Sequence, residues 1–120
     1  AYEESLRRNP QAPATMNALA FLHAERGTDL ERAPSLARSA LAQAPRLRAH
    51  ALDTLGWVLF RRGDLPGAAA ALEEALAGFA PWEARQRADA AAHLAAVRRA
   101  QGLPAEAIPP GPPAPAGEGP

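Results

Sequence analysis

The 120-residue sequence contains no cysteine and no lysine, and aromatic residues make up only 5% of it. The absence of cysteine excludes disulfide frameworks, zinc ribbons, iron–sulfur clusters and cysteine nucleophiles. No apolar run reaches the roughly 18 residues of a membrane-spanning helix. The 13 arginines are balanced by 13 aspartates and glutamates, so the formal net charge is zero. The chain therefore lacks the basic excess that non-specific binding to nucleic acid or to an acidic membrane surface requires.

Alanine and leucine supply most of the 48% hydrophobic content. This composition is typical of a helical protein, and few valines and isoleucines remain to build strands. Prolines and glycines divide the chain into segments of about 8–20 residues, the usual length of globular helices. The sequence therefore predicts an all-α fold, with breaks near residues 9–13, 27–29, 44–46, 63–66, 78–81 and 102–104.

Several residues carry the chemistry of helix starts. Thr28 and Glu31 have the S/T-x-x-E spacing of a capping box, in which each side chain satisfies a backbone N–H. Asp64 is expected to cap the helix that follows it. Pro13 and Pro81 suit the first turn of a helix, where the missing N–H costs nothing.

Leucines and small residues recur with a fixed spacing in the middle of the chain, as Leu52-x2-Leu55-Gly56-x2-Leu59-x3-Gly63-x4-Ala68-x3-Leu72-x2-Ala75-Leu76. A similar spacing runs from Met16 to Pro45 with one extra residue after Gly27, and a weaker one begins at Ala91. The pattern resembles the tetratricopeptide repeat (TPR), a helical hairpin of about 34 residues. Gly56 inside a helix costs about 1 kcal/mol relative to alanine, so it indicates a close contact between helices.

The resemblance implies an α-solenoid of antiparallel helix pairs, wound into a right-handed superhelix of about two and a half repeats. Arg98 stands where the family has a large apolar residue, which suits a terminal repeat with one solvated face. The expected units are the end of a preceding repeat at 1–10, repeats at 13–45 and 49–80, and a terminal capping repeat at 82–108. These form one helical domain over 1–108, followed by a disordered Pro/Gly-rich tail at 109–120.

The family also implies a concave groove lined by the first helix of each repeat. The middle repeat contributes four of these expected groove residues, His50, Asp53, Trp57 and Phe60. They recur at intervals of 3, 4 and 3 and therefore share one helix face. Trp57 and Phe60 either face a ligand or pack against the neighbouring first helix, and the sequence leaves both open. The residues expected to bind a peptide are Asn17, Phe21, His50, Asp53, Trp57 and Phe60.

Other site chemistries have little support in the sequence. The carboxylate clamp of chaperone-binding relatives uses lysine, arginine and asparagine, whereas the matching positions hold Asn17, Phe21, Thr54, Asp89 and His93, of which only Asn17 resembles a clamp residue. His50 and Asp53 could hydrogen-bond to each other, but no motif places a nucleophile beside them. His23 is expected to be partly buried and His93 to be a surface or packing residue. The three histidines lack the spacing of a metal site, so we expect no metal, no other cofactor and no catalysis.

We therefore expect a non-enzymatic scaffold for protein–protein interaction that binds a peptide or helix in its groove. One alternative is self-association through the open repeat edge at residues 1–10. Another is an accessory segment of a larger enzyme, such as a glycosyltransferase, or of a cell-envelope biogenesis protein. The expected partner is a protein or peptide, with no nucleic acid, no membrane insertion and no small-molecule substrate. The segment 52–64 is similar to bacterial TPR proteins, so a bacterial cytoplasm or periplasm is the expected location.

Overall fold

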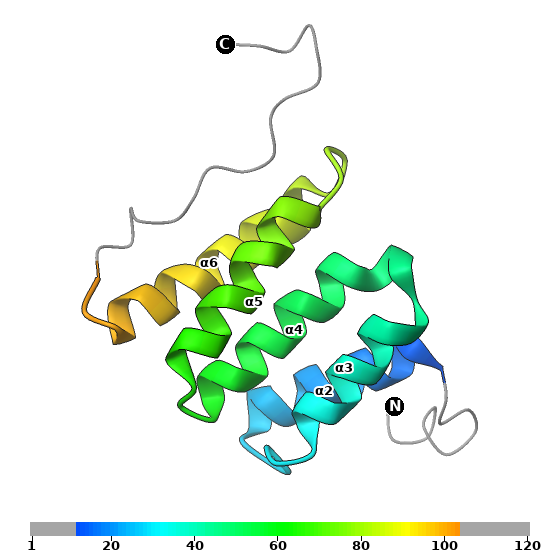
Figure 1. Cartoon of the computed structure of the whole chain (residues 1–120), viewed down its shortest axis with the longest axis horizontal. Coiled ribbons are helices and arrows are strands. Elements are labelled where there is room, and N and C mark those ends of the chain that lie inside the picture. Colours follow the sequence, from blue (N-terminus) through cyan, green and yellow to red (C-terminus); the bar gives the residue numbers. More distant parts are fainter. Residues whose placement is uncertain (1–11, 104–120) are drawn as a thin grey trace, which may run out of the picture.

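The computed structural model describes residues 12–103 (Figure 1). Within this range the chain is helical and contains no strand, which confirms the expected all-α fold. The preceding repeat end expected at 1–10, with its self-association edge, and the tail expected at 109–120 lie outside the described residues. The elements are α2 (Pro13–Arg26), α3 (Ala33–Gln43), the 3-10 turn η1 (Pro45–Leu47), α4 (Arg48–Arg61), α5 (Leu65–Gly78) and α6 (Ala84–Ala100).

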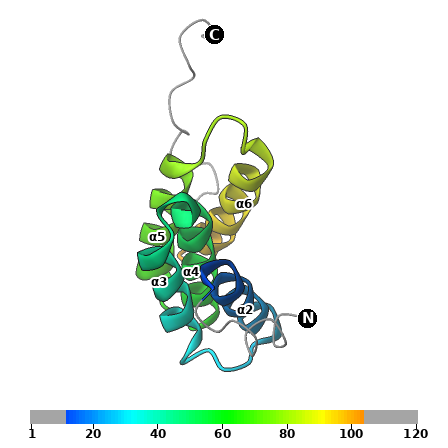
Figure 2. The same ribbon diagram turned by 90° about the vertical axis from the view of Figure 1, so that its right-hand side faces the viewer.

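The helices stack as antiparallel pairs. Each α-helix packs against the next along the chain, and α4 also contacts both α2 and α6. Figure 2 shows α3 and α5 on one side of the molecule and α2 and α6 on the other, with α4 between them. This arrangement is the expected TPR-like solenoid, in which α2 and α4 are the first helices of successive pairs and α6 takes the first-helix position that follows them.

Helices α4 and α5 pack closely against each other at Gly56. A Cβ atom added at Gly56 would lie 2.6 Å from Leu72 Cγ and 3.2 Å from the backbone oxygen of Ala68. Leu72 and Ala68 are completely buried. The mid-helix glycine therefore allows the two helix axes to approach each other, as the sequence predicted.

Two helix ends agree with the sequence prediction. The Asp64 carboxylate accepts a hydrogen bond from the backbone N–H of Gly67 at 3.0 Å, which confirms it as the cap of α5. Pro13 occupies the first position of α2. A side chain of α4 also satisfies a backbone carbonyl in the last turn of α2, because Arg61 Nε donates to the Ala24 oxygen at 2.9 Å.

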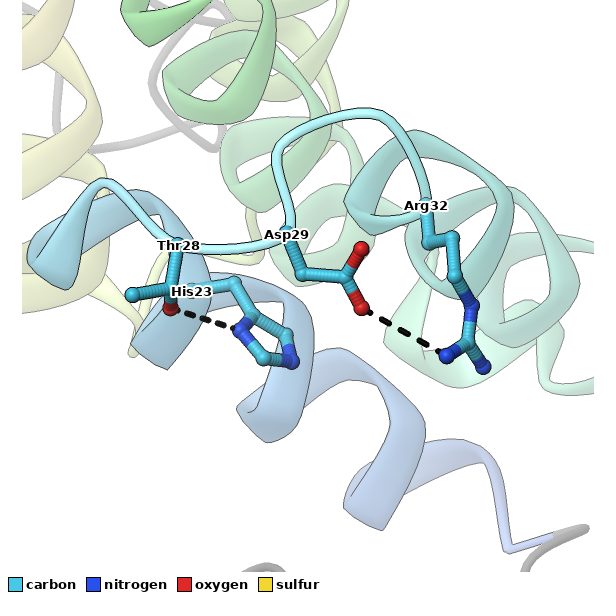
Figure 3. A network of polar contacts seen from close by, with 4 residues as sticks. All are labelled: His23, Thr28, Asp29 and Arg32. Atoms are coloured by element: carbon cyan, nitrogen blue, oxygen red, sulfur yellow. Dashed lines mark hydrogen bonds and ion pairs between the residues drawn. The ribbon is translucent and has the colours of Figure 1, made fainter.

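The capping box predicted at Thr28 and Glu31 is wrong. Helix α3 begins at Ala33, and Thr28 Oγ1 instead lies 2.9 Å from His23 Nδ1 at the end of α2 (Figure 3). The carbonyl of Asp29, a residue with φ of 46°, accepts from the N–H of Ala33, so the loop makes an extra turn before the helix. The residue inserted after Gly27 lengthens this loop and moves the helix start beyond the predicted cap.

Pro81 does not start a helix either, because α6 begins three residues later at Ala84. The N–H of Glu83 donates to the Ala80 carbonyl at 2.8 Å, which closes a β-turn across residues 80–83. Proline is favoured at the second position of such a turn for the same fixed φ that suits a helix start. Trp82 stands at the third position with 85% of its surface exposed.

None of the helices in the described part of the chain has both the length and the apolar character needed to cross a membrane.

Candidate functional site

Aromatic side chains from three successive first helices come together on one face. His93 of α6 stacks on Trp57 of α4, with ring centroids 4.4 Å apart and an interplanar angle of 27°. Trp57 also stacks on Phe60 at 5.0 Å, and Phe21 of α2 lies 6.3 Å from His93. All four side chains are half-buried. We call Phe21, Trp57, Phe60 and His93 the aromatic cluster, and the surface that carries it the first-helix face.

A polar contact accompanies the aromatic cluster. His93 Nδ1 lies 2.8 Å from Asp53 Oδ1, and the side chains of the two residues are 19% and 17% exposed. An ionised carboxylate can only accept a hydrogen bond, so Nδ1 carries the proton and donates it. The contact joins α4 to α6 next to the stacked rings, and it fixes which edge of the imidazole faces Asp53.

His50 lies apart from the aromatic cluster. Its Nε2 donates to Glu83 Oε2 at 2.6 Å, and its ring meets the edge of Phe79 with centroids 5.2 Å apart. The hydrogen bond that the sequence allowed between His50 and Asp53 is therefore absent, because each side chain pairs with a residue at or near α6. His50 holds the turn that leads into α6.

Glu83 is the residue through which His50 acts on this turn. Its second carboxylate oxygen accepts from the backbone N–H of Ala80 at 2.8 Å. The Ala80 hydrogen bond, and after it the hydrogen bond and charge of His50, lower the pKa of Glu83 below its ordinary value of 4.5, while burial opposes the shift. The ionised carboxylate thus bridges the turn and α4.

This bridge makes a contribution to stability that depends on pH. Because the pKa of Glu83 is lower in the folded than in the unfolded chain, its contribution is complete above pH 4.5 and is lost as the pH falls through the folded value. We expect Glu83→Gln to lower the melting temperature near neutral pH, and the difference from wild type to shrink on acidification. Thermal unfolding between about pH 3 and 7, followed by circular dichroism, measures this.

The exposed, uncharged Gln86 provides the control for that experiment. Gln86→Ala changes no titratable group, so its difference from wild type should stay constant across the pH range. A difference between Glu83→Gln and wild type that stays equally constant would show that the Glu83 bridge does not contribute as proposed.

The first-helix face also holds two buried polar atoms without partners. Asn17 Oδ1 of α2 and Trp57 Nε1 of α4 form no hydrogen bond with any described residue. A buried polar atom without a partner costs about 1–3 kcal/mol. Both atoms are covered in this conformation, so a ligand reaches them only after a side chain moves.

The structure thus places the expected residues in two groups. Phe21, Trp57 and Phe60 meet in the aromatic cluster with Asp53 beside them, whereas His50 supports the turn before α6. The sequence interpretation treated His93 only as a surface or packing residue, yet it connects all three helices. A signal for it existed, since His93 falls at one of the positions where clamp-type relatives carry groove residues.

The opposite side of the molecule carries a separate hollow of about 440 Å³ between α3 and α5. Its floor consists of Leu52, Leu55 and Leu59 of α4, which are already at least nine-tenths buried. None of the residues expected to bind a peptide lines this hollow. Within residues 12–103, no three acidic, histidine or cysteine side chains are grouped so that they could hold a metal ion.

Residues 48–78 match the sequence model of the tetratricopeptide repeat. This segment contains α4 and α5, the pair in which Gly56 meets Leu72. No curated protein matches the chain. Residues 48–78 therefore carry a tetratricopeptide repeat, and repeats of this family are in general modules for protein–protein interaction without enzymatic activity.

Proposed function

We propose that this TPR chain is a non-enzymatic scaffold that binds a peptide or helix of a protein partner on its first-helix face. The observation that carries the proposal is the aromatic cluster, to which α2, α4 and α6 all contribute. A site to which three successive first helices contribute presents a surface that no single repeat has, which is how solenoids bind extended partners. The proposed contacts are Asn17, Phe21, Asp53, Trp57 and Phe60, with His93 added and His50 at the edge.

The chemistry of this face suits a peptide. Half-buried aromatic rings bury a large area without ordering many torsions, and tryptophan is enriched among the residues that dominate binding energy. Asp53 and, once a covering side chain moves, Asn17 add hydrogen-bonding atoms that can orient a backbone or a polar side chain. Because the chain carries a TPR repeat, a protein is the expected class of partner, and we assign its binding site to the first-helix face.

We expect Trp57→Ala to weaken peptide binding by about 30-fold or more, the loss typical of a central hot-spot residue. The probe is a set of peptides selected by display against the immobilised wild-type protein, each then titrated by calorimetry. Trp57→Phe should retain part of the affinity, because it keeps a ring that can stack on Phe60 and His93.

Trp82 offers a matched control, since it is the other tryptophan and lies in the turn before α6. Trp82→Ala should leave the affinity within about twofold of wild type, and circular dichroism should show the same helix content in all variants. If Trp82→Ala abolished binding while Trp57→Ala did not, the binding surface would be the 80–83 turn and the proposal would be wrong.

A further inference from the structure

The carboxylate of Asp53 is a largely buried charged group on the first-helix face. Its side chain is only 17% exposed, and Oδ1 bonds His93. The other oxygen, Oδ2, forms no hydrogen bond with any residue in the range 12–103. A carboxylate that is largely removed from water needs N–H donors, preferably charged ones. If His93 moved away, Asp53 would therefore need another donor in the same place.

His93 shows what kind of group this place accepts. The His93 imidazole is a planar ring that bears an N–H group. Its centroid lies 4.4 Å from that of the Trp57 ring, and its Nδ1 donates to Asp53 Oδ1 at 2.8 Å. Trp57 follows Asp53 by four residues, so the indole and the carboxylate lie on the same face of α4. An arginine guanidinium combines the same properties, since it is planar, stacks on aromatic rings and donates N–H groups to carboxylates.

We propose that Asp53 and Trp57 form a recognition site for an arginine side chain of the partner, and that His93 occupies this site in the free protein. The inference rests on the proposed function and names the chemistry of its ligand. Asp89 supports it, because it is exposed and lies one helical turn before His93 on α6. The first-helix face therefore presents a second carboxylate close to the site, and charge complementarity favours a basic segment.

The occupied site implies competition between His93 and the ligand. Arginine binds only when the imidazole leaves Trp57 and Asp53, so part of its binding free energy is spent on displacing His93. Removal of the imidazole should therefore strengthen arginine binding, whereas removal of the Asp53 charge should weaken it. A purely structural role of the Asp53–His93 contact predicts no such opposite effects.

The test uses N-acetyl-arginine amide as the probe and N-acetyl-citrulline amide as its uncharged analogue of nearly equal shape. Titrations are followed by NMR at the indole N–H of Trp57, assigned with a Trp82→Phe variant. We expect His93→Ala to bind the arginine probe at least about tenfold more tightly than wild type. Adding Asp53→Asn to His93→Ala should reverse this gain, and the citrulline probe should bind no variant measurably.

His93→Gln covers the case in which His93→Ala unfolds. Its amide can still donate to Asp53 but does not stack on Trp57, so this variant should bind the arginine probe more tightly than wild type does. Equal affinity for the arginine and citrulline probes would overturn the inference, as would binding that Asp53→Asn leaves unchanged.

The two proposals fail in different ways. If the display-selected peptides bind in a manner that requires Trp57 but show no preference for arginine over citrulline, the inference fails and the proposed function stands. If the arginine probe binds at Asp53 while no selected peptide needs Trp57, the proposed function fails and the side-chain site stands.

Discussion

Leu72→Ala is expected to lower the free energy of unfolding by about 2–5 kcal/mol. Leu72 is completely buried and lies against Gly56, at the contact between α4 and α5. The loss combines the transfer free energy of the deleted atoms with the cavity left between two helices that cannot fully close. Because a small domain is stable by only about 5–15 kcal/mol, this change removes a large part of the total.

Urea unfolding followed by circular dichroism measures this effect. Leu103→Ala is the control, because Leu103 is 44% exposed and lies beyond the end of α6. It should change the free energy of unfolding by less than about 0.5 kcal/mol. Equal losses in the two variants would mean that the α4–α5 contact is not a centre of stability.

The repeat at 48–78 was predictable because its signals are local and agree with one another. The spacing of leucines and small residues fixes the buried faces of α4 and α5, Asp64 caps the second helix, and Gly56 marks where the helices touch. Each signal depends on residues within a few turns of each other, so neighbouring repeats do not alter it.

The two errors in helix boundaries arise from loops rather than helices. A threonine followed by a glutamate three residues later matches a capping box, but the insertion after Gly27 lets the loop use Thr28 against His23 instead. Pro81 has the fixed φ of a helix start and equally that of a β-turn. Which of these forms depends on the length of the loop and on Glu83, a side chain outside the local pattern.

In the candidate site, too, local features were predictable and contacts between helices distant in the sequence were not. The repeat register predicts which side chains of α2 and α4 share a face, and the structure brings Phe21, Trp57 and Phe60 together with His93. The sequence could not predict the hydrogen bonds from His50 to Glu83 and from His93 to Asp53, because they depend on how α6 crosses α4. The hydrogen bond between His50 and Glu83 holds the start of α6, and that helix in turn carries His93 to Asp53.

The Gly56–Leu72 contact also predicts a substitution whose effect changes sign with its background. In the wild-type chain, Gly56→Ala places a Cβ 2.6 Å from Leu72 Cγ. Overpacking of this kind costs about 1–3 kcal/mol. This cost outweighs the gain in helix propensity of about 1 kcal/mol that replacing glycine by alanine provides. We therefore expect Gly56→Ala to lower the free energy of unfolding of the wild-type protein.

In the Leu72→Ala background, the two Leu72 carbons nearest to the added methyl are absent, and of its three nearest atoms the Ala68 oxygen at 3.2 Å remains. Gly56→Ala should then raise the free energy of unfolding by up to about 1 kcal/mol, because the propensity gain persists and the methyl fills part of the cavity. Gly78→Ala is the control, since its Cβ would lie at an ordinary 3.4 Å from Ala49. Its effect should be equal in both backgrounds, because it does not touch Leu72. A Gly56→Ala effect of the same sign in both backgrounds would show that the contact with Leu72 does not decide the effect of the added methyl.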